Sequence, residues 1–210
     1  MEHVVSHCSV YQYADDTCLV SANRDIKMAA QRLQQDFTRV SKWAHDAGLV
    51  LNADKTKIIH VHSSHLKHVT SFKIIAHSHS CLHSASSGTC GCEAIGQVTH
   101  HTYLGLIVDN RLSWSFHVDS VCDKLRAILA KFYILKPKVP FKILLSMYIA
   151  LAESIIAYGI TSYGRTFKSY IERICKLQVR LVKLIVPKKI KHQHKDNVIE
   201  LFKYCNILPV

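Results

Sequence analysis

A pair of adjacent carboxylates between two β-prone runs constrains the fold of this chain more than any other feature. Residues 7–21 alternate in the manner of strands around Tyr13-Ala14-Asp15-Asp16. Two such runs joined by a short turn that contains Asp predict a β-hairpin, which would project both carboxylates from a rigid support. Carboxylate oxygens suit Mg²⁺, and paired ions suit phosphoryl transfer. The alternative is that Asp-Asp only favours a turn.

The apolar pattern that follows predicts one long helix. Apolar residues recur at helical spacing from Ile26 to Ala47, with Asn23 as the expected N-cap and Gly48 as the expected C-terminal stop. Short strands are expected at 56–62 and 103–109, and the chain after Ser120 reads as helical. Strands and one helix followed by a run of helices predict an α+β fold with a separate helical subdomain.

The net charge indicates the class of partner, and the cysteines indicate the redox compartment. The 210 residues carry a net charge of +12, which favours polyanionic partners, above all nucleic acid. The chain shows no secretory signal, and its apolar stretches are too short to span a membrane, so no membrane partner is expected. The eight cysteines are scattered rather than arranged as a disulfide framework. We therefore expect an intracellular protein; the family resemblance given below implies the nucleus as well as the cytoplasm.

The positive charge is concentrated near the C-terminus. Residues 165–203 hold eleven Lys or Arg and three Asp or Glu, a net charge of +8. Residues 168–186 are predicted to form an amphipathic helix on which four basic residues form a stripe beside the apolar side. This stripe, a candidate nucleic-acid-binding surface, comprises Arg173, Lys176, Arg180 and Lys183. A solvated charged face and a membrane-surface helix are the alternatives.

A segment rich in His and Cys separates the strands. Nine of the fifteen histidines lie between His60 and His101, and the run His77-x-His79-x-Cys81-x-His83 precedes Cys90-x-Cys92. These side chains could supply zinc ligands, but the spacing is not that of a zinc finger. A polar loop or irregular hairpin is the favoured interpretation, and bound zinc is not expected.

Three ordered motifs together resemble the reverse transcriptases of LINE-type (non-LTR) retrotransposons. Tyr13-Ala14-Asp15-Asp16-Thr17 is similar to the active-site hairpin of that family. Residues 48–56, Gly-Leu-Val-Leu-Asn-Ala-Asp-Lys-Thr, resemble the segment after its palm helix. Tyr103-Leu104-Gly105, continuing through Asp109 to His117, resembles the primer grip and its exit.

The resemblance implies a role for each matching residue. Asp15 and Asp16 would be the catalytic carboxylates that bind Mg²⁺, and Lys55 would lie near the phosphates of the incoming nucleotide. Tyr103, Leu104 and Gly105 would hold the primer end. Lys55 could instead be a solvated turn lysine, and Tyr103-Leu104-Gly105 an ordinary strand with a glycine bulge. The implied partners are an RNA template, a DNA primer and deoxynucleoside triphosphates.

The resemblance also implies a domain order within a right-hand polymerase. Residues 1–62 would be the late palm, 63–101 an insertion, 102–118 the primer-grip hairpin and 119–210 a helical thumb. The family takes a third carboxylate from a strand upstream of the hairpin, where only Glu2 is acidic here. Two adjacent like charges hold metal weakly, so this chain is expected to be inactive alone. A non-catalytic nucleic-acid-binding remnant and a decayed product without a stable fold are the rival hypotheses.

Overall fold

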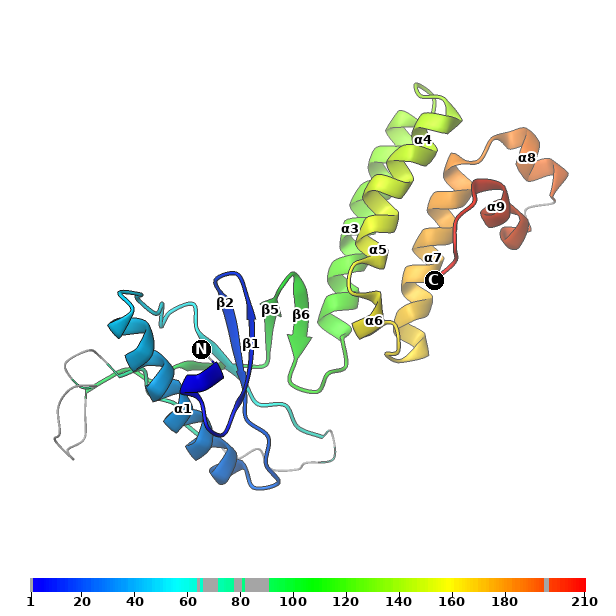
Figure 1. Cartoon of the computed structure of the whole chain (residues 1–210). Helices are drawn as coiled ribbons and strands as arrows, with labels where there is room; N and C mark the ends of the chain where they lie inside the picture. Colours follow the sequence, from blue (N-terminus) through cyan, green and yellow to red (C-terminus); the bar gives the residue numbers. More distant parts are fainter. Residues whose placement is uncertain (1, 64, 66–71, 78–80, 82–90, 195–196) are drawn as a thin grey trace. The chain divides into compact units, whose positions relative to one another are not determined.

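The computed structural model divides the chain into two compact units, Met1–Leu104 and Gly105–Val210 (Figure 1). It describes residues 2–63, 65, 72–77, 81, 91–194 and 197–210. Strands belong mainly to unit 1 and helices to unit 2, in keeping with the predicted α+β class. Among the described residues, no helix is both long and apolar enough to cross a membrane.

Unit 1 is built from short strands around one long helix. The β1–β2 hairpin is antiparallel, whereas β3 and β4 pair in parallel with Lys57 opposite Gly96. Strand β3 is shorter than the predicted strand 56–62. The elements are η1 (Glu2–Val4), β1 (Ser9–Tyr13), β2 (Asp16–Val20), α1 (Ile26–Asp46), β3 (Lys57–Ile59), β4 (Gly96–Val98) and β5 (His100–Tyr103).

Helix α1 confirms the predicted helix, but its N-cap differs from the expected one. The Asp25 side chain accepts the N–H of Lys27 at 2.9 Å, and Asn23 instead accepts the N–H of Asp25. The predicted cap at Asn23 was therefore wrong, because an Asp two residues closer to the first apolar position competes for the same role. At the other end Gly48 has a φ of +75°, and the Leu49 N–H bonds the Ala44 carbonyl, a Schellman motif.

The buried carboxylate of Asp36 attaches the start of the hairpin to α1. Asp36 is fully buried and accepts the backbone N–H groups of Ser6, His7 and Cys8 at 3.1, 2.7 and 2.8 Å. Arg39 adds an ion pair at 2.8 Å. Burial by itself raises the pKa of Asp36, but the three backbone donors outweigh it and lower this pKa to about 2. The ionised carboxylate thus replaces a regular hydrogen-bond ladder for residues 6–8.

A second polar side chain of α1 fixes the segment around Ile75. The Gln34 amide oxygen accepts the Ile75 N–H at 2.6 Å, and its NH₂ group donates to the Ile75 carbonyl at 3.1 Å. Ile75 in turn bridges Ala94 in antiparallel fashion. Next to this bridge, Ile74 and Ile95 lie opposite each other, and with Ile58 they form the small buried core of unit 1.

Unit 2 opens with one strand and continues as helices. Helix α3 begins before the predicted boundary at Ser120, and Pro140 and Pro187 directly precede α4 and α8. The segment η2 is π-helical and continues α4 into α5. The elements are β6 (Leu106–Asp109), α3 (Ser115–Leu135), α4 (Phe141–Tyr148), η2 (Ile149–Glu153), α5 (Ser154–Ala157), α6 (Ile160–Tyr163), α7 (Lys168–Ile185), α8 (Lys188–Gln193) and α9 (Val198–Cys205).

The core of unit 2 is much larger than that of unit 1. It is one cluster of twenty-two buried residues from α3, α4, η2, α5, α6, α7, α9 and the segments after α7 and α9. Within it, the buried Gln178 donates to the Tyr148 hydroxyl at 3.1 Å and to the Leu208 carbonyl at 2.9 Å, and it accepts the Val210 N–H at 3.0 Å. One amide on α7 therefore holds the C-terminal tail against the core.

The predicted strand 103–109 is interrupted by a turn. Leu104 and Gly105 both have positive φ, +47° and +76°, the pattern of a type I′ turn between strands. Strand β5 ends at Tyr103 and β6 begins at Leu106. The apolar pattern predicts a continuous strand here, because leucine rarely adopts the left-handed region that Leu104 occupies.

The Asp36 contact predicts a pH-dependent stability. Because its pKa is depressed from 3.8 to about 2, its contribution is complete above about pH 4 and is lost as pH falls through about 2. Asp36→Asn should lower the free energy of unfolding at pH 7 by about 2 kcal/mol and flatten this acid dependence. Urea unfolding of the full chain, followed by circular dichroism between pH 2 and 7, measures both effects.

The control for this experiment is Asp46→Asn, at the exposed end of the same helix. It should change the free energy of unfolding by less than about 0.5 kcal/mol. An Asp36→Asn variant with the stability and acid dependence of the wild-type chain would contradict the assignment.

Candidate functional site

The β1–β2 hairpin presents the two carboxylates at its tip, as predicted. The last pair of its register is Tyr13 with Asp16, which leaves Ala14 and Asp15 as a two-residue turn. Ala14 has a φ of +52°. Asp15 thus lies in the turn, Asp16 begins β2, and both side chains are exposed. The tip is therefore exposed to solvent.

Tyr103 lies within electrostatic range of this hairpin in unit 1. Partial burial, then the negative charges of Cys18 and Asp16, raise the pKa of the Tyr103 phenol. Residues that are far apart in the sequence, at the start of β2 and the end of β5, therefore share one electrostatic environment. That environment disfavours ionisation of the Tyr103 phenol.

Lys55 is exposed on the turn between α1 and β3. Its backbone N–H donates to the Asn52 side chain at 3.0 Å, and the Asn52 carbonyl accepts both the N–H and the hydroxyl of Thr56. These bonds fix the backbone of the turn and leave the ammonium group in solvent. The geometry is compatible with both interpretations of Lys55, a phosphate ligand and a solvated turn lysine.

Gly105, the first residue of unit 2, lies against the ring of Tyr158 in the same unit. A Cβ on this residue would stand 3.2 Å from the Tyr158 Cε1 atom, and its φ of +76° disfavours any other residue. The segment Tyr103-Leu104-Gly105 is therefore a tight turn rather than a strand with a glycine bulge. Leu104 is partly buried and Gly105 is exposed.

A buried carboxylate shapes the chain directly after β6. Asp109 accepts the N–H groups of Arg111, Ser113 and Trp114 at 3.0, 3.1 and 2.7 Å. Leu112 and Trp114 adopt positive φ within this loop. Asp109 therefore supports two strained residues and sets where α3 begins.

His117 follows on the first turn of α3. It is buried between the rings of Trp114 and Tyr163, and its Nδ1 accepts the Ile107 N–H at 3.4 Å. Burial, then the charge of Lys124, lowers the pKa of His117. The neutral imidazole of His117 therefore connects α3 to β6.

The basic stripe lies on α7, whose opposite side packs into the core of unit 2. Its four members differ, because Arg173 forms an ion pair with Asp119 of α3 at 2.5 Å. Lys176 and Arg180 are exposed, and Lys183 is half-buried. Among the described residues no ion pair involves these three. They are available to a polyanion, whereas Arg173 contributes to the α3–α7 packing.

Three members of the His/Cys segment come together. Donor atoms of His77, Cys81 and Cys92 all lie within 4.8 Å of one another. The spacing of these residues in the sequence does not predict their proximity. The remaining His and Cys residues of the segment fall into two sets. His68, His79, His83 and Cys90 lie outside the described residues, whereas the described His60, His62, His65, His100 and His101 are not part of this group.

The comparisons with known proteins agree with the geometry of the hairpin. A family model described as reverse transcriptase (RNA-dependent DNA polymerase) matches residues 1–108. The RNA-directed DNA polymerase from mobile element jockey of Drosophila melanogaster is 25% identical over 183 residues, which cover 82% of this chain and 17% of the relative. The probable RNA-directed DNA polymerase from transposon X-element of the same fly is 28% identical over 177 residues, covering 82% and 18%.

The chain therefore spans about a sixth of the length of these relatives. No solved structure matches it.

The turn at Gly105 gives a stability prediction. Gly105→Ala combines a positive φ with a close contact to the Tyr158 ring, so it should lower the free energy of unfolding by about 1–2 kcal/mol. Thermal unfolding followed by circular dichroism measures this. The control is Gly91→Ala, which has open space around it and should stay within about 0.5 kcal/mol of wild type. Equal losses in the two variants would refute the role of the turn.

Proposed function

Because the chain belongs to the reverse transcriptase (RNA-dependent DNA polymerase) family, we propose that it supplies palm and thumb residues for RNA-templated DNA synthesis by a non-LTR retrotransposon. The relatives confirm the resemblance to LINE-type enzymes. One observation carries the proposal: the matched residues 1–108 include a hairpin that presents Asp15 and Asp16 side by side at an exposed tip.

Asp15 and Asp16 are the proposed catalytic and metal-binding residues. Their oxygens are hard donors at the tip of the hairpin, Asp15 in the turn and Asp16 at the start of β2, which fits Mg²⁺. When bound, divalent ions supply charge neutralisation for phosphoryl transfer. Asp15 and Asp16 would hold such ions at the exposed tip of the hairpin. Among the described residues, no third His, Cys, Asp or Glu joins them in a ligand group, so the complete site is proposed to take a further carboxylate.

The remaining site residues are assigned by position. Tyr103, Leu104 and Gly105 are proposed to hold the primer end, because the charge of Asp16 reaches Tyr103. Lys55 is proposed to approach the phosphates of an incoming deoxynucleoside triphosphate. In this scheme residues 1–62 form the late palm, 63–101 an insertion, 102–118 the primer grip and 119–210 the thumb.

The basic stripe of α7 is proposed to track the backbone of an RNA–DNA hybrid. Lys176, Arg180 and Lys183 follow one another at helical spacing, opposite the side that packs into the core. Three cations in a row would contact successive phosphates without reading sequence.

The same exposed stripe favours a second candidate function, a nucleic-acid-binding module without catalysis. The two functions differ in whether Asp15 and Asp16 matter.

Metal binding tests the catalytic assignment. The Asp15→Asn/Asp16→Asn double variant should bind Mn²⁺ at least about tenfold more weakly than the wild-type chain, because amides do not replace paired carboxylate charge. Electron paramagnetic resonance of free Mn²⁺ measures this, with Asp46→Asn as the control. Equal affinity in all three proteins would leave only the non-catalytic module.

Primer extension by the 210-residue chain should stay at the level of the double variant, since two carboxylates hold metal weakly.

Salt-dependent binding tests the basic stripe. Replacing Lys176, Arg180 and Lys183 by Gln should reduce the slope of log K against log salt for an RNA–DNA hybrid by about 2 to 3. Arg173→Gln should change the slope less, because Asp119 already engages that guanidinium. Fluorescence anisotropy from about 50 to 200 mM salt measures the slopes.

The matched control replaces three exposed lysines elsewhere, Lys27, Lys42 and Lys138. A triple-Gln variant at these positions that loses as much slope as the stripe variant would show that only net charge matters.

A further inference from the structure

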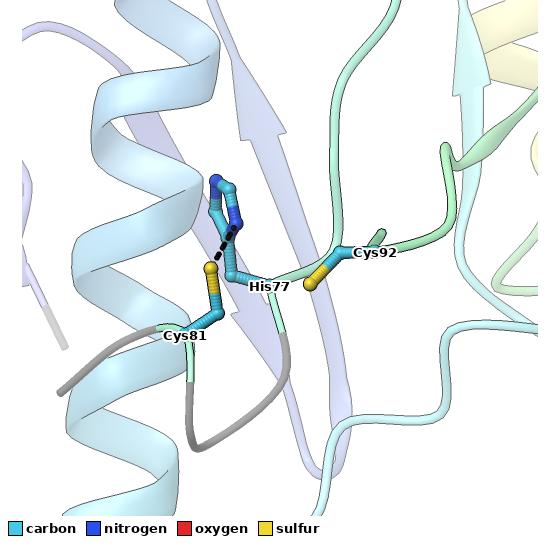
Figure 2. Close-up of side chains that lie close together, drawn as sticks. All are labelled: His77, Cys81 and Cys92. Carbon is cyan, nitrogen blue, oxygen red and sulfur yellow. Dashed lines mark hydrogen bonds between the residues drawn. The ribbon is translucent and has the colours of Figure 1, made fainter. Parts of the chain in front are cut away.

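The cluster of His77, Cys81 and Cys92 plays no part in the proposed polymerase chemistry. Figure 2 shows the imidazole and the two thiols converging from three points of the same segment. The Cys81 Sγ and His77 Nδ1 atoms are 3.3 Å apart, and all three donor atoms lie within 4.8 Å of one another. Each of the three residues is partly buried.

The backbone register accounts for two of the three members. Ile75 bridges Ala94 in antiparallel fashion, the Ile95 N–H bonds the Ile74 carbonyl, and the Ala76 N–H bonds the Glu93 carbonyl. Continuing the same pairing by one step sets residue 77 opposite residue 92. Directly opposite residues on one face of an antiparallel pair have Cβ atoms about 4.5–5.5 Å apart, so His77 and Cys92 meet because of this register.

The base of this pairing is fixed independently of the cluster. Gln34 of α1 bonds both the N–H and the carbonyl of Ile75, and Ile74 and Ile95 are buried in the core of unit 1. The positions of His77 and Cys92 are therefore imposed by contacts that a ligand does not have to create. Cys81, four residues after His77, supplies the third donor.

From this arrangement we propose that His77, Cys81 and Cys92 bind one zinc ion. One imidazole nitrogen and two thiolates are a soft donor set that selects zinc over the hard cations suited to Asp15 and Asp16. Zinc–sulfur bonds of about 2.3 Å and zinc–nitrogen bonds of about 2.0 Å place tetrahedral donors about 3.5–3.8 Å apart. The Cys81 Sγ to His77 Nδ1 distance of 3.3 Å is close to this spacing, the other donor pairs lie within 4.8 Å, and a water molecule could take the fourth position.

Zinc binding deprotonates the thiols of Cys81 and Cys92. The Sγ–H protons of Cys81 and Cys92 pass to solvent as the two zinc–sulfur bonds form, and one neutral imidazole nitrogen donates its lone pair. Affinity therefore rises with pH until both thiols ionise. The ion would cross-link His77, Cys81 and Cys92.

Zinc content and a cobalt spectrum test the site. The full chain, purified without a polyhistidine tag and under a phosphine reductant, should retain about one equivalent of zinc by elemental analysis. Cys81→Ser and Cys92→Ser should each fall below about 0.1 equivalents. Co²⁺ added to the metal-free wild-type chain should give a thiolate-to-cobalt charge-transfer band that both variants lose.

Two further variants separate ligation from folding. Cys92→His should keep zinc, because imidazole is also a ligand, and it should shift the cobalt spectrum toward fewer thiolates. Cys175→Ser, a cysteine of unit 2 outside the cluster, should leave zinc content unchanged. Zinc below about 0.1 equivalents in the wild-type chain, or equal zinc in the wild-type chain and Cys92→Ser, would overturn the proposal.

Discussion

Three backbone N–H groups of residues 6–8 converge on the buried carboxylate of Asp36, and the rest of unit 1 depends on that contact. A hairpin is marginal by itself in water, and β1 and β2 are mostly exposed. The carboxylate anchors the strand that leads to Asp15 and Asp16 to the longest helix of the unit. A negative charge buried among backbone donors therefore positions two further negative charges at the surface.

The same physical device recurs where regular structure ends. Gln34 replaces a strand partner for Ile75, Asp109 satisfies the N–H groups of the turn after β6, and Gln178 holds the C-terminal tail. In each case one polar side chain on a stable element satisfies backbone groups that would otherwise be buried without partners. The device serves both the small core of unit 1, through Asp36 and Gln34, and the larger core of unit 2, through Asp109 and Gln178.

The elements that the sequence predicted are those with local signals. Helix α1 follows from apolar spacing, its end from Gly48, and the carboxylate hairpin from β-prone runs around a short turn. Asn23 was mistaken for the cap because Asp25 offers the same chemistry closer to the helix. The turn at Leu104 was missed because nothing local marks a leucine in the left-handed region. Asp36 and the meeting of His77 with Cys92 depend on partners fifteen to thirty residues away, which periodicity does not report.

The parallel pairing of β3 with β4 has a consequence for the order in which the chain acquires structure during synthesis. Lys57 and Gly96 must meet across the whole intervening segment, and closing so long a loop carries an entropic cost before any contact offsets it. Helix α1 and the hairpin can form as soon as they leave the ribosome, but the core at Ile58, Ile74 and Ile95 cannot close until residue 98 has followed. Unit 2 also has to close a long loop, because α3 packs against α7 and Asp119 pairs with Arg173. The cores of both units therefore wait for a distant segment, although each unit contains helices that can form before that segment arrives.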